Sequence, residues 1–176
     1  MFLLSQDIAE AQSELQIPDS AFQRVPEPEA EGIVQKVKSR FLRDPQEATR
    51  WWWDSDFRLP ALAAYFNGPT VPLLSHVVPS EDQLVWFITN VDDVSGQEPI
   101  LVYASAPLAI QRILGECHGH HEYYVVARDL TWLICENHHG LILALGSSAI
   151  GQVRRYAALH PEKVRQLYDL DQGSIE

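Results

Sequence analysis

The stretch EYYVVARDLTWLICEN, residues 122–137, decides the fold. Glu122–Ala127 and Thr131–Asn137 are rich in the β-branched and aromatic residues that favour strands. The polar link Arg128–Leu130 between them has the length of a hairpin turn. We therefore expect the two segments to pair in antiparallel fashion. The face expected to be apolar holds Val125, Leu133 and Cys135.

Further strands and helices are expected on both sides of this hairpin. Ser105 is positioned to cap a helix that continues to Leu114, with Pro107 in its tolerant first turn. The other expected strands are 84–89, 100–104 and 141–145, and the other expected helices start at 146 and 161. The order from residue 80 to 170 is then β-β-α-β-β-β-α, with a short last helix carrying Val164, Leu167 and Tyr168.

The N-terminal part reads as helical. Ser5–Gln16 and Ala30–Arg43 repeat apolar residues at helical spacing. Residues 54–79 are apolar but interrupted by proline and glycine, which predicts turns and short helical pieces. The 176 residues fit one domain, with an N-terminal helical part (1–45) and a core (80–170). The expected class is α+β: a single antiparallel sheet of about five strands, with helices packed on one face and two N-terminal helices before it.

Charge and hydropathy argue against some classes of partner. The chain carries 13 Lys and Arg against 24 Asp and Glu, a net charge of −11. Nucleic-acid backbones repel such a protein, so we expect no nucleic-acid partner. No apolar run approaches the ~20 residues of a membrane span, and the start lacks a basic segment followed by a signal-peptide core. We expect a cytoplasmic protein without a membrane partner and without a disulfide between Cys117 and Cys135.

Five of the seven histidines fall in two clusters, 118–121 and 138–139. With the hairpin centred on Asp129, position 122 faces 136 and position 120 faces 138. This register would gather His120, Glu122, Glu136 and His138 on one face, where they could hold a divalent metal or act as general acid and base. The alternative is that the imidazoles simply hydrogen-bond to loops.

The sequence gives less support to a zinc site at the two Cys-x-x-His pairs. An odd separation on a strand places Cys135 and His138 on opposite faces, so this pair fits zinc only if the strand breaks. We assign no catalytic residue from sequence motifs. The glycine-rich phosphate loops and the Gly-x-Ser-x-Gly elbow are both missing from the sequence. No cofactor is expected apart from the metal considered above.

Three consecutive indoles, Trp51, Trp52 and Trp53, form the second candidate site. Neither helix nor strand geometry can point three adjacent side chains in one direction. At least one is expected to stay partly exposed and to contribute to a protein contact, since tryptophan is enriched in binding hot spots. The alternative is that it anchors a connecting loop.

Two strings carry a resemblance: Glu122–Val126 and Trp132–His139, with similar residues at 103–105 and 110–117. They resemble a family of uncharacterised bacterial proteins of unknown function over roughly residues 84–150. More distantly, the size, acidity and element order are similar to SUKH-type immunity proteins, which neutralise bacterial toxins by binding them. This likeness is one of architecture, and fold does not fix function.

These observations favour a non-enzymatic protein-binding module, of the immunity or toxin-neutralising kind. Its acidity suits a basic protein partner such as a toxin. One alternative is a small metal-dependent or acid–base hydrolase that uses His120, Glu122, Glu136 and His138. Another is a structural protein that forms a homodimer or larger assembly through its Trp cluster.

Overall fold

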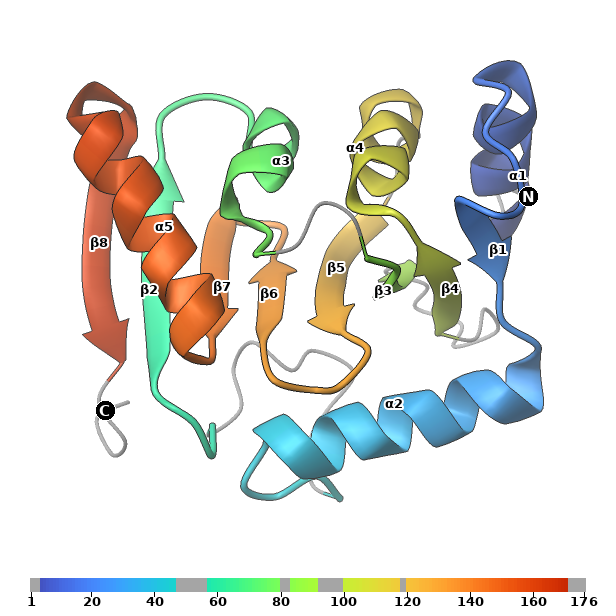
Figure 1. Cartoon of the computed structure of the whole chain (residues 1–176), viewed down its shortest axis with the longest axis horizontal. Helices are drawn as coiled ribbons and strands as arrows, with labels where there is room; N and C mark the ends of the chain where they lie inside the picture. The colour runs from blue at the N-terminus through green and yellow to red at the C-terminus, as the bar shows by residue number, and fades with distance from the viewer. Residues whose placement is uncertain (1–3, 47–56, 80–82, 92–99, 118–119, 171–176) are drawn as a thin grey trace.

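The backbone forms one eight-stranded antiparallel sheet with the strand order β1-β4-β3-β5-β6-β7-β2-β8 (Figure 1). The computed structural model describes residues 4–46, 57–79, 83–91, 100–117 and 120–170. The strands are β1 Phe22–Arg24, β2 Ala61–Phe66, β3 Val85–Val91, β4 Leu101–Ser105, β5 His120–Ala127, β6 Leu133–Glu136, β7 Leu141–Leu145 and β8 Val164–Leu170.

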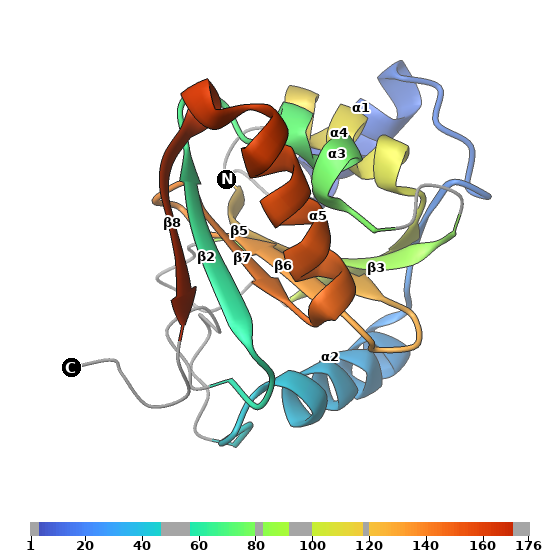
Figure 2. The same cartoon turned by 60° about the vertical axis from the view of Figure 1, so that its left-hand side comes forward.

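Helices cover both faces of the sheet. The helices are α1 Leu4–Glu14, α2 Glu27–Phe41, α3 Leu74–Val77, α4 Pro107–Glu116 and α5 Ser147–Leu159, with short 3-10 turns at Val71–Leu73 and Pro161–Lys163. Helices α1, α3, α4 and α5 pack on one face, and α2 crosses the other (Figures 1 and 2). In the described part of the chain, none of the helices has the length and apolar character that a membrane span requires.

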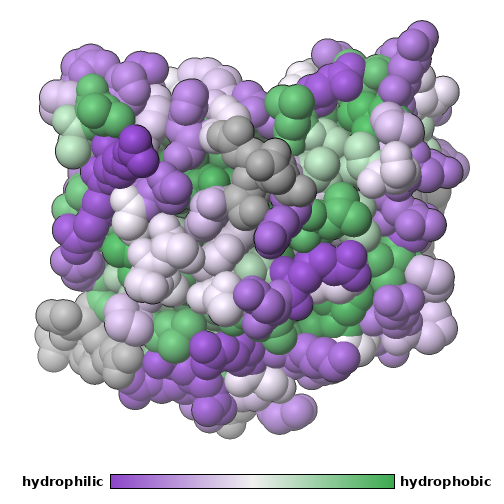
Figure 3. Space-filling model, viewed as in Figure 1, coloured by the Kyte–Doolittle hydropathy of each residue, from purple (hydrophilic) through white to green (hydrophobic). Residues whose placement is uncertain are grey.

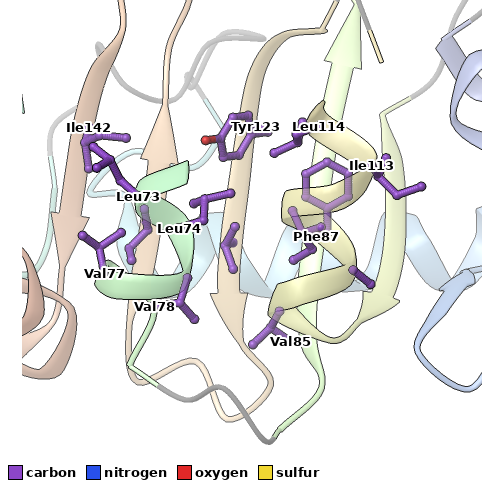
Figure 4. Close-up of a cluster of buried hydrophobic side chains, with 14 of the residues drawn as sticks. Leu73, Leu74, Val77, Val78, Val85, Phe87, Ile113, Leu114, Tyr123 and Ile142 are labelled. Atoms are coloured by element: carbon purple, nitrogen blue, oxygen red, sulfur yellow. The ribbon is translucent and has the colours of Figure 1, made fainter. Parts of the chain in front are cut away.

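Strand alternation splits the interior into two cores. Along β5, Tyr123 and Val125 face the four-helix side, whereas Tyr124 and Val126 face α2. This is the period-two pattern of strands covered on both faces. Figure 4 shows the first core, where side chains of α3 and α4 lie over Phe87 of β3 and over Tyr123. The ring of Tyr123 is buried there, with its hydroxyl at the edge of the cluster.

The expected fold is wrong in its strand number and in the placement of its helices. The sheet has eight strands rather than about five, and the helices are interspersed along the chain rather than grouped as two N-terminal helices before the sheet. Ala61–Phe66 lacks polar alternation because both its faces are buried, and it forms β2 instead of turns. Val164–Leu170, expected as a helix, is β8, which pairs with β2 at the edge of the sheet.

The hairpin of β5 and β6 is confirmed, but its register is shifted by one residue. Tyr123 pairs with Glu136 and Val126 with Leu133, so Val125 lies on the face opposite to Leu133 and Cys135. The loop has four residues, 128–131, since the Ala127 N–H donates to the carbonyl of Trp132. A change of one residue in loop length moves every side chain of a strand to the other face.

One side chain of the loop stabilises this longer turn. Asp129 Oδ1 accepts hydrogen bonds from the backbone N–H of Thr131 at 3.1 Å and from its hydroxyl at 2.7 Å. Such Asx turns are a common use of aspartate in loops. The expected cap of α4 also differs: Ala106 is the N-cap residue, and the Ser105 hydroxyl bonds to backbone carbonyls instead.

Candidate functional site: the Glu136 cleft

A cleft of about 440 Å³ opens where β2 and β6 end and where β7 and β8 begin. It is lined by polar and aromatic side chains, with two glycines at its turns. The lining residues are Tyr65, Phe66, Gly68, Pro69, Thr70, Tyr123, Glu136, Asn137, His138, His139, Gly140 and Arg165. We refer to it as the Glu136 cleft.

Glu136, the last residue of β6, is held by two hydroxyl groups. Thr70 donates a hydrogen bond to Oε1, and the Tyr123 phenol donates one to Oε2. Tyr123 and Glu136 are directly paired across β5 and β6, which places their side chains on the same face. Thr70 precedes the 3-10 turn that leads into α3 and is itself buried. The carboxyl group is therefore fixed in one orientation by two buried side chains.

Burial sets the proton affinities in this group. It raises the pKa of Glu136 above its ordinary value of 4.5, while the hydrogen bonds from Thr70 and Tyr123 act in the opposite direction. Burial, reinforced by the neighbouring Glu136, raises the pKa of the Tyr123 phenol well above 10.0. Tyr123 therefore remains a hydrogen-bond donor at neutral pH.

The turn between β6 and β7 shapes one wall of the cleft. Asn137 Oδ1 accepts hydrogen bonds from the backbone N–H groups of His139 and Leu141, both at 3.0 Å. Gly140 has φ +69°, a conformation that suits glycine, and its N–H donates to the Asn137 carbonyl. This turn holds His138 and His139 exposed at the rim, with their ring centroids 3.9 Å apart.

Two polar groups of the lining lack a partner of one kind in the described part of the chain. Asn137 is buried, and its Nδ2 has no hydrogen-bond acceptor there. Glu136 bonds to two neutral hydroxyls and forms no ion pair with a described lysine or arginine. The half-buried carboxyl group therefore has hydroxyl donors but no cationic partner among the described residues.

The four predicted metal-binding residues are only partly brought together. Glu136 and His138 line the same cleft, but Glu122 is buried on the opposite face of the sheet, which it shares with Tyr124. His120 is the first residue of β5, and its backbone pairs with Val91. Among the described residues, no three His, Cys, Asp or Glu side chains are grouped as a metal site. Metal binding by His120, Glu122, Glu136 and His138 stays a prediction.

The second predicted site, Trp51, Trp52 and Trp53, lies outside the described residues. Its role at an interface also stays a prediction.

Three residues that line the cleft, Tyr123, Thr70 and Arg165, were not among the predicted site residues. Tyr123 would follow from the correct hairpin register, which the Asp129-x-Thr131 signal of the four-residue turn could have supplied. Thr70 and Arg165 come from segments remote from the hairpin, and the pairing of β2 with β8 brings Arg165 to this end of the sheet. No short-range pattern in the sequence indicates that pairing.

The fold and the cleft together define an α+β protein with a polar cleft at the strand ends of its sheet. The family model of a family of unknown function (DUF6756) matches residues 2–157, and the chain belongs to this family. No curated protein and no solved structure matches the chain.

Proposed function

We propose that this chain is a non-enzymatic protein-binding module, of the toxin-neutralising or immunity-like kind, whose partner is a basic protein. The Glu136 cleft receives a cationic side chain of that partner. The observation that carries the proposal is the half-buried Glu136 carboxyl group, which is oriented by two hydroxyls and lacks a cation among the described residues.

A cation from a partner would complete this group. The hydrogen bonds from Thr70 and Tyr123 favour the ionised form of Glu136, and a guanidinium or ammonium group would add a charge-assisted bond. Binding of a cation would therefore lower the pKa of Glu136 and oppose the effect of burial. Because a cation would stabilise the ionised carboxyl group, the site would bind a cationic side chain in preference to a neutral one.

The residues at the rim of the cleft would determine which chemical groups can lie beside that cation. Arg165 is exposed, lines the cleft and makes no ion pair with a described carboxylate. Arg165 and the two rim histidines are exposed hydrogen-bond donors. These donors would bind hydrogen-bond acceptors of the partner. In a peptide, the backbone carbonyls next to a cationic side chain are such acceptors. The rim and the floor together fit an arginine or lysine within a peptide better than a free cation.

The outer surface favours approach of a basic protein. Helix α1, the turn after it and the first turns of α2 expose a group of carboxylates, at the end of the sheet that carries β1 (Figure 1). These are Glu10, Glu14, Asp19, Glu27, Glu29 and Glu31. They lie at the opposite end of the sheet from the Glu136 cleft, so their field would accelerate the first encounter with a basic partner without orienting it on the cleft, and salt would screen that field.

The test is a titration with blocked amino acids. N-acetyl-arginine amide should bind saturably, and N-acetyl-citrulline amide, its uncharged isostere, should not. Glu136→Gln should weaken binding of the arginine compound at least about tenfold, as expected for loss of a hydrogen bond to a charged group. Glu162→Gln removes an exposed carboxylate outside the cleft and should leave binding unchanged. Equal binding of the two compounds, or equal weakening by the two variants, would contradict the proposal.

A second candidate is the acid–base hydrolase. The observation in its favour is that Glu136, with a raised pKa, and His138 line the same cleft. Its test is hydrolysis of p-nitrophenyl acetate by the wild type, Glu136→Gln and His138→Asn. A rate above buffer that falls in both variants would favour the enzyme, and a rate indifferent to both would exclude this use of the pair.

A further inference from the structure

A second cleft, of about 510 Å³, lies between α3 and α5, on the four-helix side of the sheet. Its described lining contains Arg155, His76 and His160 and lacks Asp and Glu, in a chain whose net charge is −11. The remaining lining residues are Ser75, Val78, Pro79, Gln152, Tyr156 and Leu159. The site is thus positive or neutral, whereas the Glu136 cleft has a carboxyl group at its base.

The aromatic rings of this cleft form a fixed stack. The ring of His76 lies on Tyr156 with centroids 5.4 Å apart and planes at 28°, and His160 packs 4.6 Å from Tyr156 by centroids. Tyr156 is buried, and Lys163 Nζ donates to its hydroxyl at 3.3 Å. His76 contacts Tyr156 through the face of its ring. The two ring nitrogens of His76 lie at the ring edge, so the stack does not prevent them from forming hydrogen bonds.

The two neighbouring arginines of α5 differ in whether they already have a partner in the described part of the chain. Arg154 donates two hydrogen bonds to Asp169, at 2.6 and 2.7 Å. Arg155 lines the cleft and forms no hydrogen bond or ion pair with the described part of the chain. His160 already lies 3.7 Å from the Glu162 carboxylate, which is outside the lining. Arg155 and His76 are therefore the lining groups that have no counter-charge among the residues that the structure describes.

We propose that the α3–α5 cleft binds a small oxyanion carried on an apolar or aromatic body. Arg155 and His76 donate to the oxyanion, with Ser75 and Gln152 as neutral donors beside them. Val78, Pro79 and Leu159 supply the apolar wall, and Leu159, 65% exposed, is open to contact with the apolar body of a ligand. Phosphate and carboxylate share this chemistry, and the choice between them is left to the experiment.

The experiment is calorimetric titration at low ionic strength with inorganic phosphate, phenyl phosphate and benzoate. Phenyl phosphate should bind at least fivefold more tightly than inorganic phosphate, because its ring meets the apolar wall. Tighter binding of phenyl phosphate than of benzoate would indicate a phosphate ligand, and the reverse a carboxylate. Either order supports an oxyanion site.

Arg155→Gln and His76→Asn should each weaken binding of phenyl phosphate about fivefold or more. Arg154→Gln is the matched control, since it removes an adjacent arginine that does not line the cleft, and it should leave the affinity unchanged. Thermal melting of each variant shows whether it is folded. The proposal is overturned if phenyl phosphate does not bind saturably, if it binds no better than inorganic phosphate, or if Arg154→Gln weakens binding as much as Arg155→Gln.

Discussion

The position of the Glu136 carboxyl group opposes the stability of the fold. Its carboxyl group has lost most of its hydration, and burial raises its pKa above 4.5. The two hydroxyl donors, Thr70 and Tyr123, offset part of this cost. Residues that function requires are often unfavourable for folding, and the stability of a neutral substitute would reveal that cost.

The first prediction concerns the pH dependence of stability. Because the pKa of Glu136 is raised in the folded state, its stabilising contribution is fully present below 4.5 and is lost as the pH rises through the raised pKa. Glu136→Gln has no such proton. The free energy of unfolding of the variant, relative to the wild type, should therefore increase as the pH rises from about 4 to 7. Urea unfolding at several pH values measures it. A constant difference across this range would contradict the raised pKa.

The second prediction concerns the two thiols. Burial, with the nearby Asp7, raises the pKa of Cys117 to about 12, and burial also raises the pKa of Cys135 well above 9.0. Since the thiolate is the reactive form, alkylation by iodoacetamide at pH 8 should be at least about 100-fold slower in the folded chain than in denaturant. Mass spectrometry after a timed reaction counts the modified thiols. Fast labelling of either cysteine in the folded protein would show that its surroundings are open to solvent.

At the level of secondary-structure elements, the length of the turns limited how much of the strand register could be predicted from the sequence. The hairpin of β5 and β6 follows from the apolar character of its strands, but its register depends on whether the turn has three or four residues. That single difference separated Glu122 from Glu136 while leaving Glu136 beside His138. Tyr123 therefore takes the place opposite Glu136 that the predicted register gave to Glu122.

Strands β2 and β8 were missed for two different physical reasons. Ala61–Phe66 is buried on both faces, so it has no polar alternation to separate it from a buried helix. Val164–Leu170 has its expected helical pattern overridden by pairing with β2 at the sheet edge. Both strands depend on long-range pairing, which local patterns do not encode.

The third prediction concerns the junction between β7 and α5. Gly146 has φ +87°, and a Cβ there would lie 2.4 Å from the carbonyl oxygen of Thr131 in the β5–β6 loop. Gly146→Ala should therefore destabilise the protein by at least about 2 kcal/mol, through backbone strain and overlap. Denaturant unfolding measures the change.

Gly151 provides the control within the same helix. It is exposed in α5, and a Cβ there meets nothing within 4 Å. Gly151→Ala should stabilise the protein by about 0.5–1 kcal/mol, because alanine is the better helix former. A Gly146→Ala variant as stable as Gly151→Ala would contradict the close approach of Gly146 to the hairpin loop.

Across the whole molecule, charge is distributed unevenly. Exposed carboxylates gather on α1 and the start of α2, whereas α5 and β8 carry Arg154, Arg155 and Arg165 at the opposite end of the sheet (Figure 1). Figure 3 shows that the hydrophobic areas on the four-helix face are interrupted by hydrophilic ones. A surface of this kind favours partners chosen by charge over partners chosen by apolar contact alone.

The fourth prediction returns to the Trp triplet. If one of Trp51, Trp52 and Trp53 contacts a protein partner or a second copy of the chain, its replacement by alanine should weaken association by about 2 kcal/mol or more. The same change should leave the melting temperature nearly unaltered. A single-Trp→Ala series, followed by melting and light scattering, separates the two effects. Unfolding in all three variants without a selective effect on association would assign the triplet to core packing.

The position of β2 between β7 and β8 has a consequence for biosynthesis. Both neighbours of β2 are translated after it, separated from it by residues 67–140 and by α5. At about 5–20 residues per second, the ribosome leaves this apolar strand without partners for several seconds. A chain that ended at Lys163 would also leave β2 as an unprotected edge, the arrangement that promotes aggregation. Nascent chains of this protein should therefore depend on chaperone binding near Ala61–Phe66 until β8 has emerged.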